Sequence, residues 1–90
     1  MSEIEKKIDE CIEELSYYKH LSPEVEEAIR GFERLKERLR NLTRENIDDI
    51  LRIVELSYQR SQAYSHFIPK TVANLKYIKE WLERKREELS

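Results

Sequence analysis

The chain has 90 residues, of which 40% are charged and 39% hydrophobic, and its formal net charge is −2. A chain of this length holds one domain, residues 1–90, with a single modest core, which argues against a deep, shielded catalytic cavity. A sequence with so many charged residues folds only if its hydrophobic residues are segregated onto stripes. The predicted helices have such stripes.

The first helix is predicted over about Ser2 to Lys19. An apolar stripe runs along it at steps of three and four residues, formed by Ile4, Ile8, Cys11, Leu15 and Tyr18. This spacing is typical of a helix face that packs against a core. The single cysteine excludes an intrachain disulfide, and we interpret it as a small core residue of a reduced, cytoplasmic protein.

Ser22 and Pro23 predict the start of a second helix that continues to about Asn41. Serine caps free backbone amides, and proline fits the first turn, where no amide is needed. The matching stripe consists of Val25, Ala28, Phe32, Leu35, Leu39 and Leu42. Gly31, the only glycine, lies mid-helix, where it costs roughly 1 kcal/mol relative to alanine. We interpret it as a tolerated cost or local kink, with a close approach by another group as the alternative.

Thr43 predicts the cap of a third helix, which we expect to reach about Ser65 before Pro69 stops it. Its polar residues fall on one narrow stripe, and apolar residues cover the remainder. Three partner helices in one chain could bury so wide an arc, or fewer helices together with a second copy of the chain. The apolar arc contains Ile47, Ile50, Leu51, Ile53, Val54, Leu56, Tyr58, Ala63 and Tyr64.

A fourth helix is predicted from Lys70 or Thr71 to about Leu89. Its apolar stripe has the spacing of a core face. The same stripe is similar to the closing helix of the DnaD-like replication modules, and that resemblance implies binding to DNA and helicase loaders. The residues that carry it are Leu75, Tyr77, Ile78, Trp81 and Leu82.

The predicted links between helices are only a few residues long, and short links favour antiparallel neighbours. The sequence therefore predicts an all-α fold, a compact antiparallel four-helix bundle with up-down-up-down topology, complete in one chain or completed by dimerisation. No uncharged run is apolar enough to cross a bilayer, so we expect no membrane partner. The scarcity of Gly, Pro, Met and Cys is a thermophile-like bias.

The C-terminal half of the third helix is the least charged surface that the sequence predicts. Protein interfaces tend to lose charge and gain Tyr and Arg in this way. We therefore expect a small, non-enzymatic protein–protein interaction module, an adaptor or regulatory subunit that binds another protein or itself. Arg60 falls on the apolar stripe, so we expect its stem to lie on the core and its guanidinium to reach an acid on a neighbouring helix. The predicted interface is Tyr58, Gln59, Arg60, Gln62, Tyr64 and His66.

Basic residues from the second and fourth helices predict an alternative function, a nucleic-acid-associated module for DNA replication or RNA binding. In an up-down-up-down bundle these residues meet at one pole, where they could contact phosphates. Acidic residues are interleaved with them, so a solvated ion-pair surface is the competing interpretation. The basic residues are Arg38, Arg40, Arg44, Arg84, Lys85 and Arg86.

Arg60 and His66 suggest a third function. An Arg followed four to six residues later by His resembles the motif of the HEPN ribonucleases, helical domains that usually act on RNA as dimers. The resemblance implies that Arg60 contacts the phosphate and His66 handles a proton. Ser61 departs from the Asn, Asp or His that this family prefers. His20 is expected at the same pole as His66, but two histidines alone make a poor metal site, so we expect no metal and no cofactor.

Overall fold

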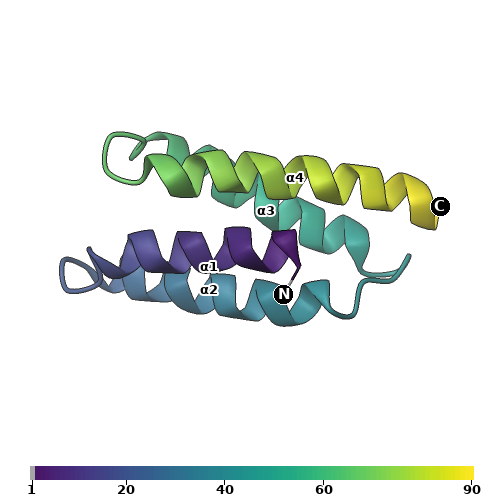
Figure 1. Ribbon diagram of the computed structural model, residues 1–90, viewed down its shortest axis with the longest axis horizontal. Helices are drawn as coiled ribbons and strands as arrows, with labels where there is room; N and C mark the ends of the chain where they lie inside the picture. Colours follow the sequence, from purple (N-terminus) through teal and green to yellow (C-terminus); the bar gives the residue numbers. More distant parts are fainter. Residues whose placement is uncertain (1) are drawn as a thin grey trace.

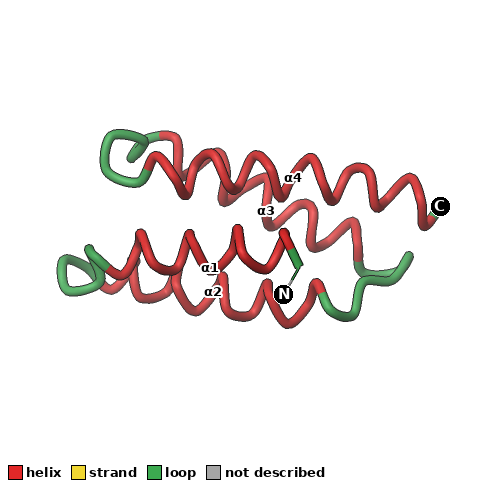
Figure 2. Tube along the Cα trace, viewed as in Figure 1, coloured by secondary structure: helices red, strands yellow, loops and turns green. Residues whose placement is uncertain are grey.

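The computed structural model describes residues 2–90 and contains the helices α1 (Glu3–Ser16), α2 (Pro23–Leu39), α3 (Ile47–Gln62) and α4 (Pro69–Leu89). Consecutive helices run in opposite directions, as Figure 1 shows. The part of the chain that the structure describes has helices and connecting turns only (Figure 2). The predicted all-α, antiparallel four-helix bundle is therefore confirmed.

The ends of the helices differ from prediction by a few residues, most clearly at the start of α3. Ser2 caps α1, because its hydroxyl accepts a hydrogen bond from the Glu5 amide at 3.3 Å. Thr43 and Asn46 instead form a reciprocal pair, in which each amide donates to the other's side chain at 2.9 and 3.1 Å. This pair closes a turn ahead of α3, so the helix begins at Ile47 rather than beside Thr43.

Pro69 opens α4 rather than only ending α3, because proline fits the first turn of a helix. The chain leaves α3 after Gln62 and turns through residues 63–67. This turn is fixed to the α1–α2 connection, since the Tyr18 hydroxyl donates to the Phe67 carbonyl at 3.0 Å.

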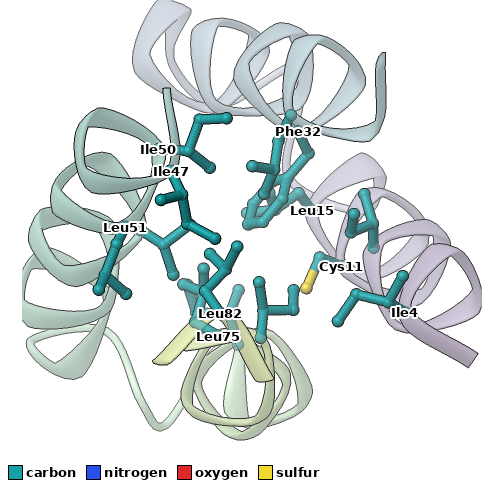
Figure 3. Packing of buried hydrophobic residues seen from close by; sticks show 14 residues of the cluster. Ile4, Cys11, Leu15, Phe32, Ile47, Ile50, Leu51, Leu75 and Leu82 are labelled. Atoms are coloured by element: carbon teal, nitrogen blue, oxygen red, sulfur yellow. The ribbon is translucent and has the colours of Figure 1, made fainter. Parts of the chain in front are cut away.

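The core runs along the inside of the bundle and receives side chains from every helix (Figure 3). The predicted stripes of α1 and α4 are confirmed as core faces. In α2 only Phe32 and Leu35 are fully buried, and the rest of its stripe is partly covered. The buried core is Ile4, Ile8, Cys11, Leu15, Phe32, Leu35, Ile47, Ile50, Leu51, Val54, Ile68, Leu75, Ile78 and Leu82.

A polar joint fixes α1 against α4. The Glu14 carboxylate accepts hydrogen bonds from the backbone amides of Lys70 and Thr71 at 3.0 and 2.6 Å. A turn further along α4, the buried Asn74 side chain donates to the Lys7 carbonyl at 3.0 Å and to the Glu10 carboxylate at 2.9 Å. An acid of α1 thus caps the N-terminus of α4, where free amides need acceptors.

The helices α2 and α3 are the loosest neighbours in the bundle. Close helix packing joins α3 to α4, α1 to α2 and α1 to α4, but not α2 to α3. Ion pairs cross the α1–α2 and α3–α4 contacts, at Asp9–Lys36 and Asp48–Arg86. Over residues 2–90 no such pair joins α2 to α3. Helix α2 therefore packs only loosely against α3, and the outer side of α3 has no helix against it.

Candidate functional site

The uncovered side of α3 carries two large apolar side chains. Ile53 is 45% exposed and Leu56 is 44% exposed, although the sequence predicted both as part of a buried arc. That prediction is wrong for these two residues. Ile53 borders the loosely packed gap to α2, and Leu56 lies on the outer side of α3, nearly opposite the buried residues of the helix. The prediction is also wrong for Ala63 and Tyr64, which are exposed beyond the end of α3. Tyr58 is half-buried, and the remaining residues of the arc are confirmed as core: Ile47, Ile50, Leu51 and Val54.

A groove of about 160 Å³ lies between α2 and α3. Gly31 forms part of its α2 wall, and Ile50 and Ile53 form its α3 wall. A methyl group added at Gly31 would meet no atom within 4 Å, so nothing in the described chain requires glycine there. The alternative interpretation of Gly31 was a close approach by another group. No group in the described part of the chain makes that approach.

The predicted interface residues do not share one surface. Tyr58 is half-buried and packs against the core, whereas Gln59, Arg60, Gln62, Tyr64 and His66 are exposed. Successive helical residues point about 100° apart, so Tyr58, Gln59 and Arg60 face three different directions. Helical spacing places only Arg60 on the side of Ile53 and Leu56, and Tyr64 lies in the turn beyond the end of α3.

The expectation for Arg60 is wrong in one respect. Its side chain is exposed, and among residues 2–90 no acid pairs with it and no acceptor binds it. The reason is geometric, because Arg60 lies on the side of α3 that no other helix covers.

The sequence signal for the whole surface was the run Asp49, Ile53, Leu56 and Arg60, spaced by four, three and four residues.

An aromatic cluster lies beyond the C-terminal end of α3. Tyr64 and Phe67 are 59% and 62% exposed in the α3–α4 turn. The Phe67 ring also packs edge to face against Tyr18 of the α1–α2 connection, with 6.3 Å between ring centroids. These aromatic rings are exposed in the connection that follows α3.

His20 and His66 lie in the two connections at the same end of the bundle (Figure 1), and both are exposed. No contact between them is seen, and none joins His66 to Arg60 within the described chain. In residues 2–90 no group of three or more His, Cys, Asp or Glu side chains is arranged to hold a metal ion. Burial raises the pKa of the Cys11 thiol to about 12, so it stays protonated and unreactive at neutral pH.

The basic residues gather near the opposite end, where the α2–α3 connection lies beside the end of α4 (Figure 1). Several are already engaged. Arg40 pairs with Glu5 at 3.1 Å, Arg86 with Asp48 at 3.5 Å, and Lys85 with Glu88 at 3.2 Å. The Arg44 side chain donates to the Leu89 carbonyl at 2.8 Å. Arg38 and Arg84 are exposed without a pairing acid among the described residues. This arrangement favours an ion-paired surface over a phosphate-binding one.

No family model, curated protein or solved structure matches the chain. Within the described part of the chain, no helix has both the length and the apolar character needed to cross a membrane. The candidate site is therefore the uncovered surface of α3, formed by Asp49, Ile53, Leu56 and Arg60 with the groove beside Gly31, and is called the open face below.

Proposed function

We propose that the chain is a protein–protein interaction module that binds through the open face. The observation that carries this proposal is the exposure of Ile53 and Leu56 on a helix whose other large aliphatic residues are buried. Covering the exposed part of two such side chains would contribute about 1 kcal/mol each. The chain then acts as an adaptor or regulatory subunit, by contact rather than by catalysis.

The composition around these two residues supports the same role. Arginine and aromatic side chains are the residue types that most often dominate binding energy at interfaces. Arg60 lies one turn beyond Leu56, and the exposed Tyr64 follows the end of the helix. The groove beside Gly31 adds a concave element, because the missing side chain leaves the backbone of α2 open to a partner.

Affinity capture with three forms of the full chain tests the proposal. The wild-type chain is compared with the double variant Ile53→Gln, Leu56→Gln and with the control Leu21→Gln. Leu21 is an exposed leucine, 77% accessible, in the α1–α2 connection rather than on α3. Helix content of each form is checked by circular dichroism. We expect the wild type and the control to retain the same protein and the double variant to bind it at least about tenfold more weakly. Equal retention by all three forms, or no bound protein and no self-association, would contradict the proposal.

A further inference from the structure

The open face has the spacing of a helix-pairing seam. Asp49, Ile53, Leu56 and Arg60 follow one another at four, three and four residues, which is the repeat that keeps one side of a helix facing a partner helix. Its centre is apolar and its two ends carry opposite charges. This seam is separate from the core face of α3, where Ile50 and Val54 are buried.

The seam is complementary to its own reversed copy. The midpoint of Ile53 and Leu56 lies between residues 54 and 55, and the midpoint of Asp49 and Arg60 is the same point. Two α3 helices that run antiparallel about that midpoint place Ile53 of each copy against Leu56 of the other. The same register places Asp49 of each copy against Arg60 of the other. A parallel pair would instead set Asp49 against Asp49 and Arg60 against Arg60.

Both charges are free to form this contact. Neither the Asp49 carboxylate nor the Arg60 guanidinium has an ion pair or a side-chain hydrogen bond within residues 2–90. Many other charged side chains of the bundle are paired, including Asp48, which lies next to Asp49 and binds Arg86. The open face therefore holds an apolar centre and two unused charges of opposite sign in a symmetric arrangement.

We infer that a second copy of this chain covers the open face, with the two α3 helices antiparallel and related by a two-fold axis. Such an interface is isologous, since both copies use the same residues. The inference rests on the proposed function and names the partner of the same surface. The packing of Ile53 against Leu56 holds the two copies together. The Asp49–Arg60 pairs make the two helices antiparallel rather than parallel.

The test is a charge exchange followed by sedimentation of the full chain. In D49R, both pairs of the homodimer become Arg against Arg, and in R60D both become Asp against Asp. When the two variants are mixed, the heterodimer has two Asp–Arg pairs again. Both wild-type charges also suit the helix dipole of α3, but dipole effects act within each chain and mixing does not relieve them. Circular dichroism confirms that each variant keeps its helix content.

We expect the wild type to dimerise reversibly in the range of about 10 to 500 micromolar. Each single variant should dimerise at least about tenfold more weakly, and the equimolar mixture should recover most of the wild-type affinity. A wild type that stays monomeric throughout, or a mixture no tighter than the separate variants, would overturn the inference. Neither result decides the proposed function, because capture with the Ile53→Gln, Leu56→Gln chain tests whether this surface binds a different protein.

Discussion

Glu14 joins two helices that are more than fifty residues apart in the sequence. Its carboxylate binds the first two amides of α4, at Lys70 and Thr71, while its backbone belongs to α1. A carboxylate suits this position, because the N-terminus of a helix carries free amides and a partial positive charge. One side chain therefore caps α4 and fixes its entry point against α1.

Replacing Glu14 with alanine should lower the free energy of unfolding by about 1 kcal/mol, which is the usual cost of losing a helix cap. Chemical denaturation of the two proteins measures the difference. Glu13→Ala is the matched control, since Glu13 is exposed and has no ion pair or side-chain hydrogen bond in the described part of the chain. Equal effects of the two substitutions would show that the cap contributes nothing specific.

Glu10 gives the same joint a dependence on pH. The hydrogen bond from Asn74 lowers the pKa of the Glu10 carboxyl below its ordinary value of 4.5, with smaller contributions from Lys7, Lys70 and Lys6. A carboxyl whose pKa is lower in the folded state stabilises the fold above its unfolded pKa. That stabilisation is lost as the pH falls through the folded value.

The stability advantage of the wild type over Glu10→Gln should therefore be present at neutral pH and shrink below about pH 4.5. Thermal unfolding of both proteins across the acidic range measures it. A difference that stays constant, or that grows as the pH falls, would be inconsistent with an ionised Glu10 bound to Asn74.

Helix α2 contains a glycine that lowers the stability of the helix, and the packing of α2 does not explain why it is there. Gly31 lies in the middle of the helix, and the space where its side chain would lie is empty. Gly31→Ala should therefore raise the free energy of unfolding by about 1 kcal/mol through helix propensity alone. Denaturation at low protein concentration measures it, and Ala73→Gly, at an exposed site of α4, is the reciprocal control that should lose a similar amount. A loss of stability in Gly31→Ala would reveal a contact that the glycine protects.

Helix α3 separates what the sequence could predict from what it could not. Apolar spacing correctly predicted the buried faces of α1 and α4, because each helix has one stripe and that stripe meets the core. In α3 the apolar residues form two adjoining faces. The pattern records that Ile53 and Leu56 are apolar, but it does not record whether another helix covers them. That depends on how the other helices are arranged around α3, which is a tertiary property.

The candidate site was predicted only in part for the same reason. Arg60 and Tyr64 were named from their residue types, and both are exposed near the open face. Tyr58 was named with them, but it lies two residues before Arg60, and this turns its side chain about 200° round the helix, toward the core. Asp49 was missed, because its role depends on the symmetry of two copies rather than on its neighbours in the chain.

At the scale of the whole molecule, the bundle is closed on three of its four sides. Packed helices and ion pairs join α2 to α1 and α3 to α4, and the polar joint links α1 to α4. The fourth side, between α2 and α3, has the groove that Ile53 borders, and the rest of the open face continues from it onto the outer side of α3. A second copy placed there would cover this side without disturbing the rest of the core.

Amide chemical shifts followed by nuclear magnetic resonance through a dilution series test this account most directly. A titration from about 1 millimolar to about 10 micromolar spans the expected dissociation. Dimerisation through the open face predicts concentration-dependent shifts along residues 49–60 of α3 and at Gly31 of α2, with little change on the outer side of α1. Shifts that do not depend on concentration, or that cluster on another surface, would contradict self-association through the open face.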